Sequence, residues 1–138
     1  MNKTPVDIDQ EAILLFHDLA EQRDNYARTD EKAGFTVSSE FRHRFFSLLD
    51  ALNLRLIDDR DNFFGYFLFQ ADRDLRFQLD SPTGTTFKNG RYTLYFNPYL
   101  FLQLTAEQME SAVKHEVLHI LSLHPLRTKE VILSGQPL

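Results

Sequence analysis

The feature that most constrains this chain is a segment near its C-terminus, residues 104–123, which runs without glycine or proline. Thr105 and Gln108 have the spacing of a capping box, which predicts a helix start at this point. Apolar side chains recur at helical spacing at Met109, Val113, Val117 and Ile120. We therefore expect a helix whose apolar side packs in a core and whose opposite side lines a cleft.

This predicted helix carries the sequence HEVLH. On an α-helix His115 and His119 lie about 40° apart, one turn from each other, so two imidazoles can bind one ion. Glu116 lies about 100° round from His115, where its carboxylate can reach a metal-bound water. The H-E-x-x-H arrangement is typical of zinc peptidases. It predicts that Zn²⁺ activates the water, that Glu116 acts as general base, and that the reaction is amide hydrolysis.

A catalytic zinc ion needs a third protein ligand, and the sequence leaves its identity open. His124 is the nearest candidate, but on a straight helix it would point about 180° away from His115. Pro125 disfavours helix at the residue before it, so the chain can fold back and bring His124 to the metal. Glu130 is the only acidic residue after the motif and is the second candidate. The other readings are a helix-capping or substrate-binding role for His124 and a ligand outside this chain.

The rest of the chain predicts an α+β domain. We expect helices over residues 8–28 and 39–53, the first capped by Asp7 and the second by Ser38 or Ser39. Three strands are predicted over 62–70, 75–79 and 91–96, with residues 71–74 as a turn. Asn89-Gly90 predicts a type I′ hairpin turn between residues 85–87 and the last strand, and Asn97-Pro98 predicts a short helix. Residues 1–138 should form one domain with a small antiparallel sheet.

Composition narrows the possible functions. Hydrophobic residues make up 43% of the chain, enough for a core, and the net charge of −5 with interspersed signs argues against nucleic acid. Because cysteine is absent, any metal must be bound by His, Asp or Glu. No secretory signal and no apolar run of roughly 18 residues is present, so we expect a cytoplasmic protein without a membrane partner. The final residues, 129–138, end on turn formers, and we expect them to lead into a longer protein.

Residues 91–127 resemble a bacterial zinc metallopeptidase family whose members often carry a von Willebrand factor A-like module further on. The resemblance lies in an aromatic strand running into Asn97-Pro98, a Leu-Thr helix start, the HEVLH core, and then His124 and Arg127. It implies a zincin-like, cytoplasmic, proteolytic domain with His115 and His119 as ligands and Glu116 as base. Members usually continue into a helix bearing an Asp, and this chain stops before such a segment.

Two other functions remain open: a non-catalytic zinc-containing peptide-binding or scaffold domain, and a chance motif in an interaction module. For a peptidase, the partner is a peptide or protein substrate, and residues 85–89 and 91–96 are candidate edge strands for pairing with it. His17 and His43 are predicted to be surface residues. Tyr95 and Tyr99 are either oxyanion donors or ordinary half-buried aromatics.

Overall fold

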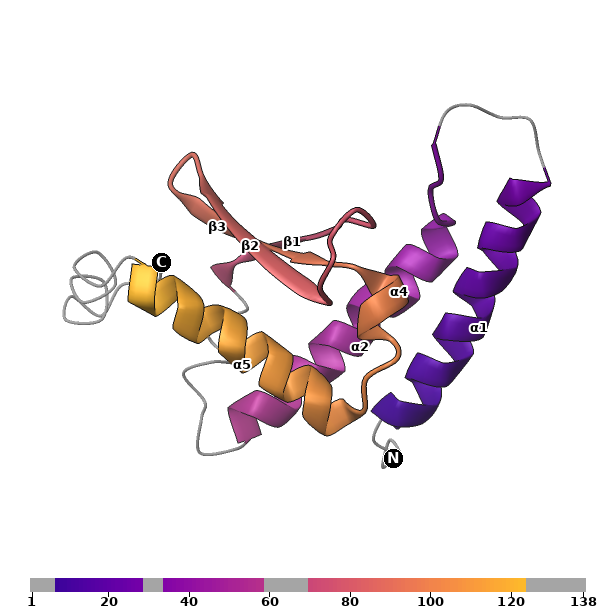
Figure 1. Ribbon diagram of the computed structural model, residues 1–138. Helices are drawn as coiled ribbons and strands as arrows, with labels where there is room; N and C mark the ends of the chain where they lie inside the picture. Colours follow the sequence, from indigo (N-terminus) through magenta and orange to yellow (C-terminus); the bar gives the residue numbers. More distant parts are fainter. Residues whose placement is uncertain (1–6, 29–33, 59–69, 124–138) are drawn as a thin grey trace.

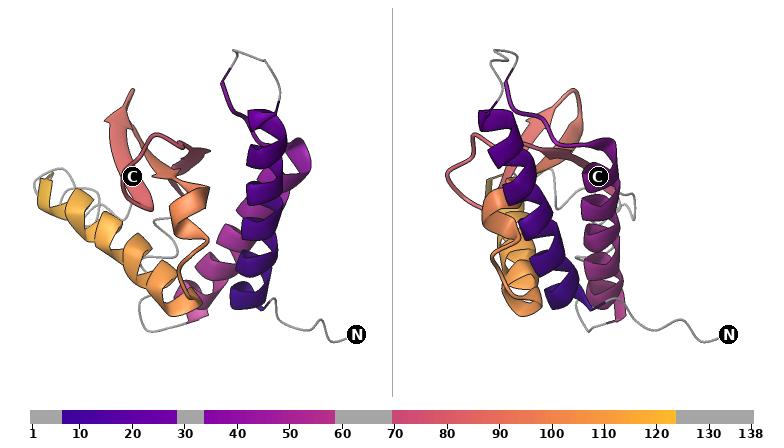
Figure 2. Two further views of the ribbon diagram at one scale, coloured as in Figure 1. Left: turned by 45° about the vertical axis from the view of Figure 1, so that its right-hand side comes forward. Right: turned by 90° about the vertical axis from the view of Figure 1, so that its right-hand side faces the viewer.

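The computed structural model describes residues 7–28, 34–58 and 70–123. The elements follow in the order α1 (Ile8–Ala27), α2 (Ser39–Asp58), β1 (Asp72–Leu75), β2 (Thr83–Lys88), β3 (Arg91–Phe96), α4 (Pro98–Phe101) and α5 (Ala106–Leu123). Figure 1 shows α1 and α2 as an antiparallel pair. Figure 2 shows the sheet and α5 together on one side of that pair, with α4 between. The predicted α+β class is confirmed.

Both N-terminal helices begin where the sequence predicts. The Asp7 carboxylate accepts a hydrogen bond from the Gln10 amide at 3.1 Å, and the Ser38 hydroxyl accepts one from the Phe41 amide at 3.1 Å. The predicted apolar stripes are buried, as Ile8, Ala12, Leu15 and Leu19 in α1 and as Phe41, Phe45, Leu48, Leu49 and Leu52 in α2. α2 extends beyond its predicted end because Leu56 continues the buried stripe.

The sheet is mixed, so the prediction of a purely antiparallel sheet is wrong. β2 pairs with β3 antiparallel, but β1 pairs with β3 parallel, which gives the order β1-β3-β2. After β1 the chain crosses to the opposite edge of the sheet and forms β2 there. β3 follows the hairpin turn, runs parallel to β1 and occupies the central position between β1 and β2.

The hairpin between β2 and β3 is confirmed. Asn89 and Gly90 have φ values of 56° and 77°, and the register closes with Lys88 opposite Arg91. A two-residue turn with positive φ at both positions fits the twist of the flanking strands, and Asn and Gly adopt this conformation at low cost.

β1 is found where the sequence predicts a turn. The strand comprises Asp72–Leu75, and the alternating residues 76–79 that were expected to be extended form a turn instead. The charged side chains of β1 find partners distant in sequence: Arg91 for Asp72, Asp50 for Arg73 and Arg42 for Asp74. These pairings offset the poor strand propensity of Asp, and they cannot be predicted from the local sequence because the partners are distant along the chain. The strand predicted over residues 62–70 falls almost entirely outside the described part of the chain.

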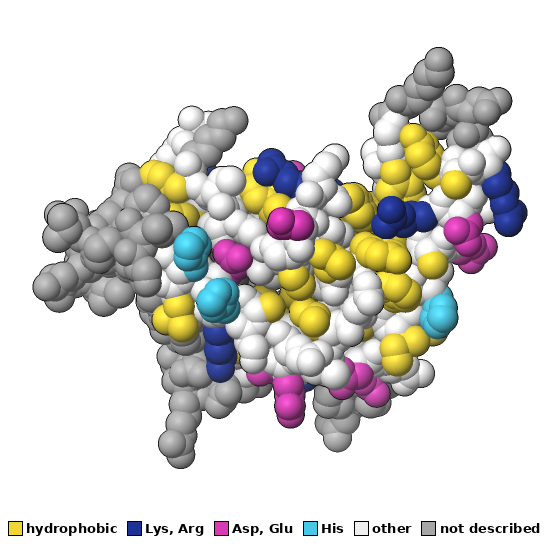
Figure 3. Space-filling view, in the orientation of Figure 1, with side chains coloured by type: hydrophobic (Ala, Val, Ile, Leu, Met, Phe, Trp, Pro, Cys, Tyr) yellow, Lys and Arg dark blue, Asp and Glu magenta, His cyan; other side chains and the backbone are white. Residues whose placement is uncertain are grey.

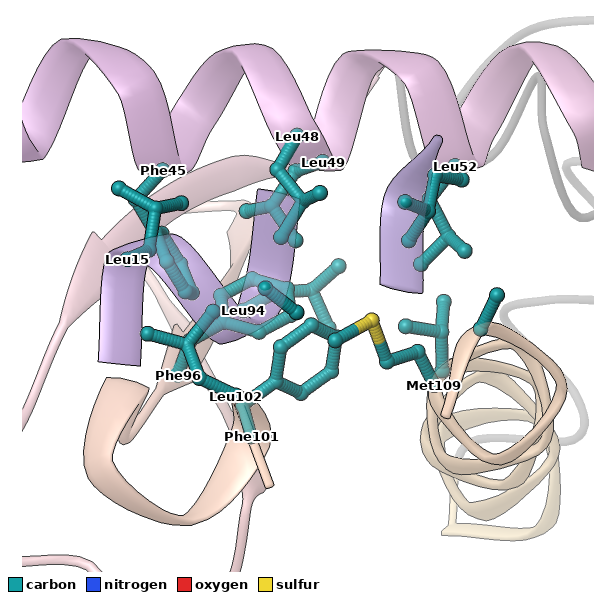
Figure 4. Close-up of a cluster of buried hydrophobic side chains, with 14 of the residues drawn as sticks. Leu15, Phe45, Leu48, Leu49, Leu52, Leu94, Phe96, Phe101, Leu102 and Met109 are labelled. Carbon is teal, nitrogen blue, oxygen red and sulfur yellow. The ribbon is translucent and has the colours of Figure 1, made fainter. Parts of the chain in front are cut away.

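The core gathers side chains from α1, α2, β3, α4 and α5, as Figure 4 shows. Phe45, Phe96 and Phe101 form a triangle of edge-on rings with centroids 5.2 to 6.0 Å apart, which ties α2, β3 and α4 together. Asn97 accepts a hydrogen bond from the Tyr99 amide at 3.1 Å and thereby caps α4 as predicted. α4 therefore fixes the path of the chain from the sheet into α5.

Candidate metal centre

The start of α5 is fixed by hydrogen bonds at its first turn. The predicted capping box is confirmed: the Gln108 amide donates to the Thr105 hydroxyl at 3.2 Å, and the Thr105 amide donates to Gln108 Oε1 at 2.9 Å. Asp9 of α1 adds a cap that the sequence did not reveal, since its Oδ1 accepts from the Ala106 amide at 2.7 Å. A carboxylate at this position also interacts favourably with the helix dipole.

One side of α5 is buried along its length. The side chains of this stripe are 0 to 2% exposed, namely Met109, Val113, Val117 and Ile120. On the α2 side, Arg55 and Glu110 form an ion pair at 2.8 Å in which the glutamate is mostly buried. The rotation of α5 about its axis is therefore set by packing, and the predicted apolar stripe is confirmed.

The opposite side of α5 presents the imidazoles to solvent. His115 and His119 are both exposed, and helical geometry places them one turn apart on the same side. Figure 3 shows two histidine side chains next to each other on the surface over α5, with an acidic side chain alongside. Leu118, on the same side of the helix, is 51% exposed. These two imidazoles are the candidates on α5 for holding a metal ion, and they are accessible from the solvent side.

Glu116 lies between the two sides, against β2. Its carboxylate accepts a hydrogen bond from the Thr83 hydroxyl at 3.2 Å and a second one from the Thr85 hydroxyl at 2.6 Å. The side chain is half-buried, unlike the two histidines. The carboxylate is thus held at the junction of α5 and the sheet, beside the histidine side of the helix.

Residues 53–133 match the sequence profile of a family described as "putative metallopeptidase domain". The chain belongs to this family. No curated protein and no solved structure shows significant similarity to it. The match covers α5 and the whole sheet, so the HEVLH segment and the strand that contacts Glu116 both lie within the metallopeptidase domain. Family membership indicates a metal-dependent peptidase.

The described residues offer no third candidate ligand beside His115 and His119. His124 and Glu130, the two candidates from the sequence, lie outside them. Over residues 7–28, 34–58 and 70–123, no group of three His, Asp or Glu side chains is close enough to hold a metal ion.

Among the described helices, none is long and apolar enough to cross a membrane.

The other candidate residues, His17, His43, Tyr95 and Tyr99, lie on elements other than α5. His17 on α1 and His43 on α2 are exposed, as predicted. Tyr99 packs against Phe16 of α1 with ring centroids 5.5 Å apart, and Tyr95 lies under the Arg76 guanidinium at 3.9 Å. Both tyrosines therefore have packing partners outside the histidine side of α5.

Of the two candidate edge strands, only one lies at an edge. β3, which contains residues 91–96, is the central strand, so the suggestion that it pairs with substrate is wrong. β2 is an outer strand of the described sheet and is the strand that lies against α5. Sequence reasoning missed Thr83 and Thr85 because nothing local shows that β2 and α5 meet.

Proposed function

We propose that this domain is a zinc-dependent peptidase in which His115 and His119 bind the metal and Glu116 is the general base. The observation that supports it best is the arrangement on α5. Two exposed imidazoles lie one turn apart, and a carboxylate beside them is held against an outer strand, all within a metallopeptidase family match. Together these features support a hydrolytic metal site of the H-E-x-x-H type.

The donor set fits zinc. Imidazole nitrogen is a good zinc ligand, and the chain has no cysteine that would direct the site toward a structural thiolate centre. Both imidazoles are exposed, so neither must leave a packed interior to bind an ion. His124 is the first candidate for the third ligand, with Glu130 and residues beyond this chain as the others.

A bound Zn²⁺ would supply an acidified water and a polarised scissile carbonyl. Glu116 accepts the proton of the attacking water on a carboxylate oxygen and later delivers it to the nitrogen of the leaving amine. Because each carboxylate oxygen carries more than one lone pair, an oxygen bonded to a threonine hydroxyl can still accept this proton. His115 and His119 hold their positions through the buried stripe on the other side of α5.

Metal and turnover can be tested separately. Purified protein should contain about one zinc ion per chain by plasma mass spectrometry, and His115→Ala and His119→Ala should lose it. His17→Ala removes an exposed histidine from α1 and should keep the metal. Retention of zinc by both α5 variants would contradict the assignment.

Glu116→Gln then separates the peptidase from the non-catalytic zinc domain. The variant should retain zinc while its cleavage of fluorescein-labelled casein or a fluorogenic peptide mixture falls at least about a hundredfold. Zinc-loaded wild-type protein that cleaves neither probe would favour the scaffold reading.

We also propose that substrate binds as an extended strand beside β2. Main-chain pairing with an outer strand gives affinity that tolerates many side chains, and β2 lies next to the carboxylate of Glu116. A cleaved peptide should lose affinity when backbone amides at alternate positions are N-methylated, because only every second residue bonds to the same neighbouring strand. Uniform tolerance of N-methylation along the peptide would exclude this binding mode.

A further inference from the structure

Each oxygen of the Glu116 carboxylate accepts a hydrogen bond from a hydroxyl group of β2. Thr85 Oγ1 donates to Oε2 at 2.6 Å and Thr83 Oγ1 donates to Oε1 at 3.2 Å. Hydrogen bonds to an ionised acceptor are stronger than neutral ones, and the shorter of the two lies in the range typical of O–H···O⁻ contacts. Thr85 should therefore be the stronger partner.

The backbone of β2 explains why both hydroxyls reach one carboxylate. Side chains alternate across a strand, so Thr83 and Thr85 lie on one face while Gly84 faces the other way. A Cβ on Gly84 would lie 3.3 Å from the Leu79 methyl groups, so the Leu79 side chain packs closely against that face of β2. On the face toward α5 the opposing β3 residues are Leu94 and Phe96, both buried.

Apolar neighbours make the hydroxyl contacts selective. Thr83 is only 9% exposed, and the side chains opposite both threonines offer no acceptor. A buried hydroxyl without an acceptor costs free energy, so donation to Glu116 is favoured over other orientations. The geometry thus restricts a glutamate that would otherwise sample many rotamers.

We propose that Thr83 and Thr85 are positioning residues that hold the Glu116 carboxylate beside the histidine side of α5. This inference rests on the proposed function, because it assigns the two hydroxyls a part in the proton transfer by Glu116. A general base held in one orientation reacts more often from a productive geometry, and misplacement by about 1 Å can cost about a hundredfold in rate. The alternative is that the two contacts only fasten β2 to α5.

The contact itself is tested on metal-free protein by a double-mutant cycle with Thr85→Val and Glu116→Met. Valine keeps the shape of threonine and methionine keeps the length of glutamate, but neither can form the hydrogen bond. The coupling should be about tenfold in the unfolding equilibrium constant, as expected for a bond to a charged group. The matched control is Thr86→Val, because Thr86 is the next residue of β2 and is exposed. Its effect on the unfolding equilibrium constant should combine with that of Glu116→Met within about twofold of additivity.

The positioning role is tested on the zinc-loaded chain with a fluorogenic peptide mixture. Thr85→Val should lower kcat about tenfold or more while KM changes less than about twofold, and Thr85→Ser, which keeps the hydroxyl, should recover most of the rate. Zinc affinity, measured by competition with a chromophoric chelator, should match wild type. Thr83→Val should show the same pattern with a smaller loss.

Additive behaviour in the Thr85 cycle, or a Thr85→Val enzyme with wild-type kcat, would overturn the inference. Coupling without any effect on kcat would show a purely structural contact and would overturn it as well. If zinc-loaded wild-type protein cleaves neither casein nor the peptides, the proposed function fails and the positioning role fails with it. The cycle needs no turnover, so it still reports whether the contact exists.

Discussion

The two sides of α5 differ in almost every physical respect. The buried side includes four large apolar residues that are at most 2% exposed, whereas the other side presents two histidines and a half-exposed leucine to solvent. The buried side therefore supports the stability of the domain, and the solvent side contributes little to it. The candidate metal ligands are therefore held in place by residues on the other side of their own helix.

The largest effect on stability should come from placing a charge on the buried side. Val117→Asp puts an unpaired carboxylate among the core side chains and should lower the free energy of unfolding by about 4 kcal/mol or more. The neighbouring Leu118→Asp changes a side chain that is 51% exposed and should cost less than about 0.5 kcal/mol. Urea denaturation of the two variants measures the difference, and similar losses for both would show that the two sides of α5 contribute equally to stability.

Loss of volume on the buried side should have the next largest effect. Met109→Ala removes a fully buried side chain from the hydrophobic core, to which Phe101 also belongs, and should cost about 2 to 4 kcal/mol. Zinc affinity of the folded protein should be unchanged, because Val113, Val117 and Ile120 still hold the part of α5 that carries the histidines. Titration with a chromophoric chelator below the melting temperature checks this expectation.

Removal of the cap that α1 supplies to α5 should have a smaller effect on stability. Asp9→Ala deletes the carboxylate that accepts from the Ala106 amide, which should cost about 1 kcal/mol. Amide hydrogen exchange should rise in the first turn of α5 more than near His119. Uniform acceleration along the helix would show that the cap supports the whole of α5 instead of its first turn.

The smallest effect should follow from removing a candidate ligand in metal-free protein. His115→Ala should change the free energy of unfolding by less than about 0.5 kcal/mol, because the side chain is exposed. Excess zinc should raise the melting temperature of wild-type protein but not of the variant, since a ligand stabilises only the state that binds it. A large loss of stability without metal would assign His115 a structural role.

Local patterns predicted much of this fold. The starts of α1, α2, α4 and α5 follow from capping residues, and the buried stripes follow from helical spacing. The hairpin follows from Asn89-Gly90, whose conformation depends on little beyond those two residues. These features are decided within a few residues, so the sequence displays them directly.

Contacts between distant segments could not be predicted in this way. β1 is a strand because its backbone pairs with β3, its charged side chains add ion pairs to α2 and β3, and its parallel alignment depends on where the hairpin docks. The same holds for the site. Its histidines follow from one helical turn, but the threonines of β2 meet Glu116 only through the tertiary fold. The third ligand stays a prediction, because both candidates lie outside the described residues.

The position of β3 between β1 and β2 has a consequence for the order of folding. The β2-β3 hairpin closes over a two-residue turn, whereas β1 pairs with β3 over a longer stretch of chain, so the fast, local closure of residues 83–96 should precede docking onto β1. Substitutions in the Asn89-Gly90 turn should then slow refolding, whereas substitutions in β1 should mainly accelerate unfolding. The two threonines that contact Glu116 would accordingly be aligned on the hairpin before β1 joins the sheet.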